Sequence, residues 1–153
     1  MEFESSLNLY TDAYFMREAF KEAQKAYDAD EVPVGAVVVC NNQIIARAHN
    51  LTERLIDVTA HAEMQAITSA ANYIGGKYLL DCTLYVTIEP CHMCAGALAW
   101  SQISKIVYGA SETKKGFSLL NQGILHPKTE VVKGILADDC EKILKDFFAK
   151  RRK

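Results

Sequence analysis

The sequence predicts an α/β fold, a three-layer sandwich in which a five-stranded mixed sheet carries helices on both faces. Two observations predict this fold class. In the second half of the chain, short β-branched runs alternate with helical patterns, as in sheets that contain parallel strands. In the first half, two apolar runs flank the turn at Asn41–Asn42, as in an antiparallel hairpin. A sheet with both kinds of pairing follows.

The first half of the chain predicts one helix and two strands. Thr11 can cap a helix whose apolar residues recur at three- and four-residue steps. Val32–Cys40 is almost continuously apolar and predicts a strand that is buried on both faces. Gln43–Asn50 predicts the returning strand of the hairpin. Residues 51–60 are polar and irregular, so we expect a loop there.

The second half predicts three strands and three helices. Ala60–Tyr73 is rich in alanine and predicts a helix that ends at the glycine pair Gly75–Gly76. The elements expected after it are a strand over Thr83–Pro90, a helix over Cys91–Trp100, strands over Ser104–Ala110 and Glu130–Ile135, and a last helix with one apolar face from Leu136 to Phe148.

The composition excludes several classes of protein. Half of the 153 residues are hydrophobic and 24% are charged, which is ordinary for a globular protein. The net charge of −2 excludes a chain that is basic as a whole. We see neither a signal peptide nor an apolar run of the roughly 18 residues that a membrane span needs. We therefore expect one domain over residues 1–153, located in the cytoplasm, with no membrane partner.

The cysteines point to a metal site. Their number, five, is odd and argues against a disulfide framework in a reducing compartment. Cys91 and Cys94 form a C-x₂-C pair at the start of a predicted helix, where the helix N-terminus favours thiolates. His61 would complete three ligands for tetrahedral Zn²⁺. Because no second C-x₂-C or H-x₃₋₅-H pattern offers a fourth ligand, the count favours an open, catalytic zinc. The other three cysteines are expected to be small buried side chains: Cys40, Cys82 and Cys140.

Glu63 supplies a carboxylate close to this metal site. Two residues apart on a helix, His61 and Glu63 would not share a face, so we expect Glu63 to carry protons rather than to bind the metal. His61 alone could be a core histidine, and the whole site could belong to a non-catalytic zinc module. A carboxylate beside the metal argues against the second alternative, since a structural site has no use for it.

The order H-x-E and then P-C-x₂-C resembles the signature of the zinc nucleobase deaminases. Nearly the whole chain resembles the bacterial tRNA adenosine deaminases, through the stretches EVPVGAVVV, HAE, TLYVTIEPCHMCAGAL, SKIVYGA and GILADDCEKILKDFFAKRR. The resemblance implies the cytidine deaminase-like sandwich and a homodimer. It implies one Zn²⁺ per subunit on His61, Cys91 and Cys94, with Glu63 as proton shuttle. It also implies that adenosine becomes inosine by zinc-hydroxide attack on C6, at the wobble position of a tRNA anticodon stem-loop.

The same resemblance implies three substrate contacts. Asn50 takes the place of a base-contacting asparagine, and Val32 and Pro33 take places in the pocket wall. From the sequence alone, Asn50 could equally turn the chain before the irregular loop. His92 departs from the family, where this position inside the C-x₂-C pair is often apolar. We expect its side chain to point away from the metal.

A basic run ends the chain. Residues 141–153 hold six basic and two acidic side chains, and the densest part is Lys150, Arg151, Arg152 and Lys153. These four residues either contact RNA phosphates or form a solvated helix end. The alternative function is a deaminase of a free base or nucleoside, such as guanine or cytosine, with the same zinc site. The basic run favours tRNA.

Overall fold

The computed structural model describes residues 10–120 and 123–151. Its elements in chain order are α2 (Asp12–Asp28), β1 (Gly35–Cys40), β2 (Gln43–His49), α3 (Ala62–Ile74), β3 (Cys82–Ile88), α4 (His92–Ser101), β4 (Lys105–Ala110), the short 3-10 turn η1 (Phe117–Leu119), β5 (Glu130–Lys133) and α5 (Ala137–Arg151).

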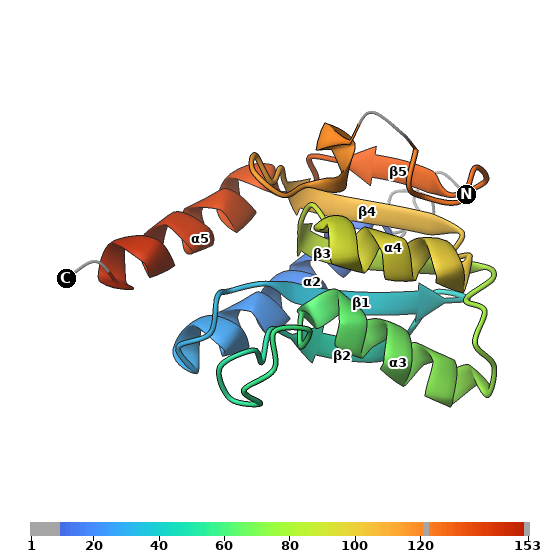
Figure 1. Cartoon of the computed structure of the whole chain (residues 1–153), viewed down its shortest axis with the longest axis horizontal. Helices are drawn as coiled ribbons and strands as arrows, with labels where there is room; N and C mark the ends of the chain where they lie inside the picture. Colours follow the sequence, from blue (N-terminus) through green and yellow to red (C-terminus); the bar gives the residue numbers. More distant parts are fainter. Residues whose placement is uncertain (1–9, 121–122, 152–153) are drawn as a thin grey trace, which may run out of the picture.

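The five strands form one sheet in the order β2-β1-β3-β4-β5 (Figure 1). β1 pairs antiparallel with both β2 and β3, whereas β3, β4 and β5 are parallel. A tight two-residue turn joins β1 to β2 and makes them an antiparallel hairpin. This turn requires positive φ, which both Asn41 and Asn42 adopt. The predicted mixed sheet is confirmed.

Helices cover both faces of this sheet (Figure 1). α3 and α4 lie on one face, where the alanines of α3 and Leu98 of α4 pack on Val38, Leu84 and Ile106. α2 and α5 lie on the other face and pack on Val37, Tyr85 and Val107. Because neighbouring strand residues point to opposite faces, a strand between two helical layers must be apolar throughout. This explains the continuous apolar run that the sequence shows in β1.

Several element boundaries differ from the predictions. The first strand begins at Gly35 rather than Val32, because the Val34 N–H bonds back to the Val32 carbonyl in a local turn. β5 ends at Lys133 because Gly134 turns the chain with a φ of 83°. α3 and α4 begin one residue after His61 and Cys91, which are N-cap residues with extended backbones. The sequence patterns did not predict η1.

Several strands and helices begin or end at the same end of the sheet. The N-terminus of β1 and the C-termini of β2, β3 and β4 lie there, as the strand registers require. α3 and α4 begin at this same end, and the loop from β2 to α3 and the loop after β4 flank it (Figure 1). In the part of the chain that the structure describes, no helix is long and apolar enough to cross a membrane.

Gly35 allows α2 to lie directly on β1. A Cβ at this position would overlap the Ala19 carbonyl oxygen and the Ala23 nitrogen, both in the backbone of α2. Among the described residues, nothing lies within 4 Å of a Cβ built on Gly76 in the loop after α3. The two glycines therefore form a matched pair.

We predict that Gly35→Ala lowers the free energy of unfolding by about 1–3 kcal/mol, since backbone atoms must shift to admit the methyl group. Gly76→Ala should change it by less than about 0.5 kcal/mol. Denaturant unfolding of both variants measures the difference. Equal stability of the two variants would contradict the close packing of α2 on β1.

Candidate metal centre

Two helix N-termini bring three metal-binding side chains together. His61 is the N-cap of α3 and Cys91 is the N-cap of α4, and Cys94 lies in the first turn of α4. The His61 Nδ1 atom lies 3.7 Å from Cys91 Sγ and 3.5 Å from Cys94 Sγ. All three donor atoms lie within 4.8 Å of one another, and in the described residues no other group of this kind occurs.

These separations fit one tetrahedral zinc ion. Zinc bonds of about 2.3 Å to sulfur and 2.0–2.1 Å to nitrogen place the two ligand atoms about 3.5 Å apart at the tetrahedral angle. The two nitrogen–sulfur distances match this value. Two thiolates and one imidazole are a donor set that zinc prefers, and three protein ligands leave one position open. The spacing and chemistry of the cluster therefore suit a catalytic zinc site.

The surroundings of Cys91 favour its thiolate form. Hydrogen bonds from Cys94 and from His61 lower the pKa of Cys91 to about 3, against the opposing effect of burial. The pKa of His61 is raised, chiefly by its hydrogen bond to Cys91. The pKa of Cys94 is also raised, chiefly by its hydrogen bond to Cys91. A divalent cation would replace the shared protons, because ligands bind metals in their deprotonated forms.

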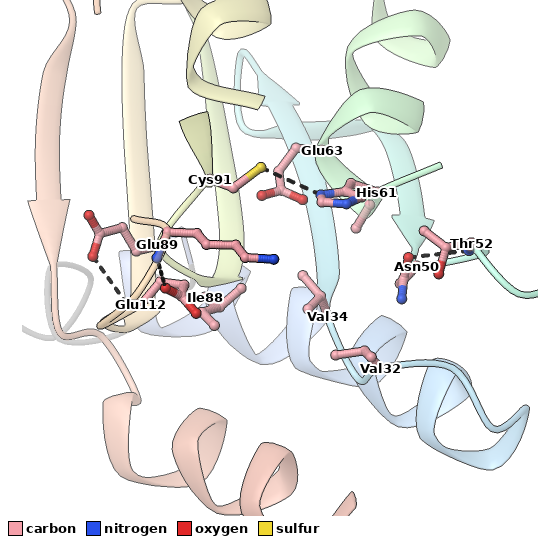
Figure 2. Close-up of a pocket in the computed structure, with 12 residues that line it drawn as sticks. Val32, Val34, Asn50, Thr52, His61, Glu63, Ile88, Glu89, Cys91 and Glu112 are labelled. Carbon is pink, nitrogen blue, oxygen red and sulfur yellow. Dashed lines mark hydrogen bonds between the residues drawn. The ribbon is translucent and has the colours of Figure 1, made fainter. Parts of the chain in front are cut away.

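Glu63 lies beside this cluster in the first turn of α3 and is 3% exposed. Burial raises the pKa of its carboxyl to about 7. The expectation that His61 and Glu63 would not share a face assumed that both belong to the helix. His61 instead precedes the helix, and both side chains line the same cavity (Figure 2). Glu63 is outside the group of three donors, as the sequence predicts.

A cavity of about 270 Å³ opens at the cluster (Figure 2). Its volume is close to the lower end of small-molecule sites and suits one planar base. Besides the cluster and Glu63, its walls include Val32, Val34, Asn50, Thr52, Ile88, Glu89, Glu112 and Lys115.

Of the three predicted substrate contacts, Asn50 and Val32 line the cavity and Pro33 does not. Asn50 is buried and lines the cavity, and its Oδ1 also accepts a hydrogen bond from the Thr52 N–H at 3.3 Å. The position of Asn50 therefore fits both hypotheses, a substrate contact and a residue that turns the chain before the loop. Val32 lines the cavity, but Pro33 does not and Val34 does. Pro33 is buried at the centre of the turn in which the Val34 N–H bonds to the Val32 carbonyl, and it is not part of the cavity wall.

Three charged residues in the cavity wall were not predicted. Glu89 ends the segment before Pro90–Cys91, and Glu112 and Lys115 follow β4. For Glu89 the sequence offers one signal of a functional position, a glutamate directly after a buried strand. His92 is exposed and lies in a groove on the outer side of α4, away from the metal ligands.

Half of the basic run contacts the protein itself. Lys150 Nζ lies 3.4 Å from Asp30 Oδ1 and 4.4 Å from the centre of the Tyr27 ring. Arg151 Nη1 donates a hydrogen bond to the Asp30 carbonyl at 3.3 Å. The described part of the run is therefore fixed against the end of α2. Arg152 and Lys153 lie outside the described residues.

Comparison with known proteins identifies the family. A family model described as MafB19-like deaminase matches residues 10–152. The chain is 47% identical over 147 residues to the tRNA-specific adenosine deaminase of Bacillus subtilis (strain 168), covering 93% of this chain and 91% of that protein. The chain belongs to the tRNA-specific adenosine deaminase family. The family expected from the sequence is thereby confirmed.

Solved structures agree with this assignment to the tRNA-specific adenosine deaminases. A structure from work on A-to-I editing by tRNA:A34 deaminases at the wobble position of transfer RNA superposes with a TM-score of 0.81 and 40% identity, covering 86% of this chain and 99% of that chain. A guanine deaminase from Bacillus subtilis superposes with a TM-score of 0.62 and 39% identity, covering 65% of this chain and 64% of that chain. The likeness to the tRNA deaminase extends over more of the chain.

We predict one zinc ion per chain in the wild-type protein and its loss in Cys91→Ala. Thermal stability should fall as well, because metal-binding energy at such a site is also folding energy. Cys40→Ala, which changes a cysteine outside the donor group, should keep a full zinc content. Elemental analysis of the three proteins measures this, and a normal zinc content in Cys91→Ala would show the ligand set to be wrong.

Proposed function

We propose that the protein converts adenosine to inosine at the wobble position of a tRNA anticodon, with Zn²⁺ held by His61, Cys91 and Cys94. One observation carries the proposal: a His/Cys/Cys cluster with tetrahedral spacing shares a base-sized cavity with the buried carboxyl of Glu63. Family membership supports the tRNA substrate.

Glu63 moves the protons of this hydrolysis. His61, Cys91 and Cys94 would hold the zinc ion, which would lower the pKa of a water at its open position to about 7. A carboxyl with a pKa raised to about 7 can both accept and return protons near neutral pH. Glu63 accepts a proton from the attacking water and passes it to the ring nitrogen next to C6. It then accepts the remaining proton of the new C6 hydroxyl and delivers it to the amine as the C6–N bond breaks, so that inosine and ammonia leave.

The cavity walls select a single extruded base. Val32, Val34 and Ile88 offer apolar surface to the faces of a purine ring, and Asn50 offers an amide for its polar edge. The target base must leave its stack to reach Glu63. Bases in RNA loops are already partly unstacked, so an anticodon loop lowers the free energy needed for this movement.

A second copy of the chain suits the outer side of α4. Trp100 is 86% exposed there and lines an apolar groove with Met93, Gly96 and Ala97. Exposed apolar patches of this kind mark contact surfaces. We therefore assign this surface to the homodimer that the family resemblance implies.

We also infer that residues 1–153 form one deaminase domain. The family model matches residues 10–152 without interruption, and the five strands of the described residues belong to one sheet. A tRNA substrate places the protein in the cytoplasm.

Sequencing of tRNA after incubation with the zinc-loaded protein tests the proposed function. Inosine should replace adenosine at the wobble position, and ammonia should be released from an anticodon stem-loop. Free guanine and free cytosine should release none. Ammonia from guanine with unchanged tRNA would instead favour the free-base deaminase, the function of the guanine deaminase with which the structure also superposes.

We predict that Glu63→Gln retains zinc and tRNA binding but lowers turnover by at least about 10²–10⁴-fold, the usual contribution of general acid–base catalysis. The amide keeps the shape of the side chain but cannot carry the proton. Single-turnover assays with zinc quantified in the same samples measure this effect. A rate close to that of the wild type would remove Glu63 from the mechanism.

We predict that deletion of residues 150–153 weakens tRNA binding and flattens its salt dependence. Each phosphate contact that is lost should lower the log–log slope by about 0.7–0.9. Zinc content should not change, because the run lies outside the metal cluster. Binding at several salt concentrations decides the point: an unchanged affinity and slope would make the run a structural contact with Asp30 only.

A further inference from the structure

Two buried glutamates each hold a loop that lines the cavity, and the mechanism above uses neither. Glu31 is 1% exposed and Glu89 is 2% exposed. A buried carboxylate is costly unless its oxygens accept hydrogen bonds. Each of these carboxylates directs both of its oxygens to main-chain N–H groups of a neighbouring loop.

Glu31 holds the loop between β2 and α3. Its Oε1 accepts from the Glu53 N–H at 3.0 Å, and its Oε2 accepts from the Arg54 N–H at 2.7 Å. Thr52, next to these residues, lines the cavity. Ile56 in the same loop has a φ of 50° and is 92% exposed. Because a β-branched residue rarely adopts this conformation, the loop depends on contacts of this kind to keep its shape.

Glu89 holds the loop after β4 in the same way. Its Oε1 accepts from the Glu112 N–H at 3.1 Å (Figure 2), and its Oε2 accepts from the Ser118 N–H at 2.9 Å. Glu112 and Lys115 of this loop line the cavity. A Cβ on Gly116 would lie 2.5 Å from Glu89 Cδ, so the loop and the carboxylate are in direct contact.

We propose that Glu31 and Glu89 are positioning residues that fix the two opposite walls of the substrate cavity before the substrate binds. Hydrogen bonds to a charged acceptor are roughly twice as strong as neutral ones, and two per carboxylate define the orientation of each loop. Walls ordered in advance spare the substrate the entropic cost of ordering them. The effect on substrate binding rests on the proposed function, but the anchoring of the loops does not.

Hydrogen exchange of the zinc-loaded protein tests the anchoring. Glu31→Gln and Glu89→Gln keep the shape of each side chain but replace one acceptor with an amino group that faces an N–H. Exchange should become on the order of 10–100-fold faster in residues 51–56 for Glu31→Gln, and in residues 111–118 for Glu89→Gln. In each variant, the other loop should exchange at the wild-type rate.

Glu22→Gln is the matched control. Glu22 is also a buried glutamate, at 3% exposed, but its carboxylate contacts the side chains of Lys25 and Arg47 rather than a loop of the cavity. Exchange in both loops should be unchanged in this variant. If either anchor variant does not fold, Glu31→Asp or Glu89→Asp replaces it, since the shorter carboxylate keeps its charge but cannot span both N–H groups.

Kinetics with an anticodon stem-loop test the consequence for the substrate. Each anchor variant should raise KM by about tenfold and change kcat by less than about threefold, which is the sign of lost binding rather than lost chemistry. Zinc content should stay at the wild-type value. Unchanged exchange in both loops, or faster exchange throughout the chain with an unchanged KM, would overturn the proposal. If no stem-loop is deaminated at all, the proposed function fails and the exchange data alone decide the anchoring.

Discussion

The structure depends on one junction, where the N-termini of α3 and α4 meet beside the end of β3. His61 and Cys91 occupy the two N-cap positions, so their extended backbones direct both side chains out of the helices toward each other. α3 lies close to the sheet because its fully buried core residues are alanines. The partial positive charge at the helix ends also favours thiolates. Metal binding therefore follows from how the helices begin, and the cavity opens where the flanking loops leave this junction.

Three buried glutamates around the cavity differ in what their oxygens contact. Glu31 and Glu89 accept pairs of main-chain hydrogen bonds, which suits carboxylates with a fixed position. Glu63 lies beside the His/Cys/Cys cluster, and burial raises its pKa to about 7. A carboxyl group with a pKa near 7 can exchange protons at neutral pH. A carboxylate that accepts two main-chain N–H hydrogen bonds is instead fixed in place, and its movement would disturb the loop that donates them. The same residue type thus holds a loop in two of these environments and, in the function that we propose, carries protons in the third.

Much of this architecture could be predicted from the sequence, because periodicity and spacing report local structure. The five strands follow from short patterns, and the three predicted metal ligands, which short patterns also single out, lie together in the structure with Glu63 beside them. Pro33 was misplaced because a resemblance gives a segment but not which of its residues face the cavity. Glu31 and Glu89 were not recognised, since their partners are N–H groups 22 to 29 residues away and every residue type except proline carries such a group. The contacts of Lys150 and Arg151 with Asp30 could not be predicted, because they depend on how α5 packs against α2.

The central claim is that one zinc ion lies at this junction with two sulfur ligands and one open position. X-ray absorption at the zinc edge of the loaded, substrate-free protein measures this most directly. We predict two sulfur atoms at about 2.3 Å and two lighter atoms at about 2.0–2.1 Å, one from His61 and one from solvent. A shell of three or four sulfur atoms would contradict the claim, because it would require another cysteine as ligand and would close the position that the reaction needs.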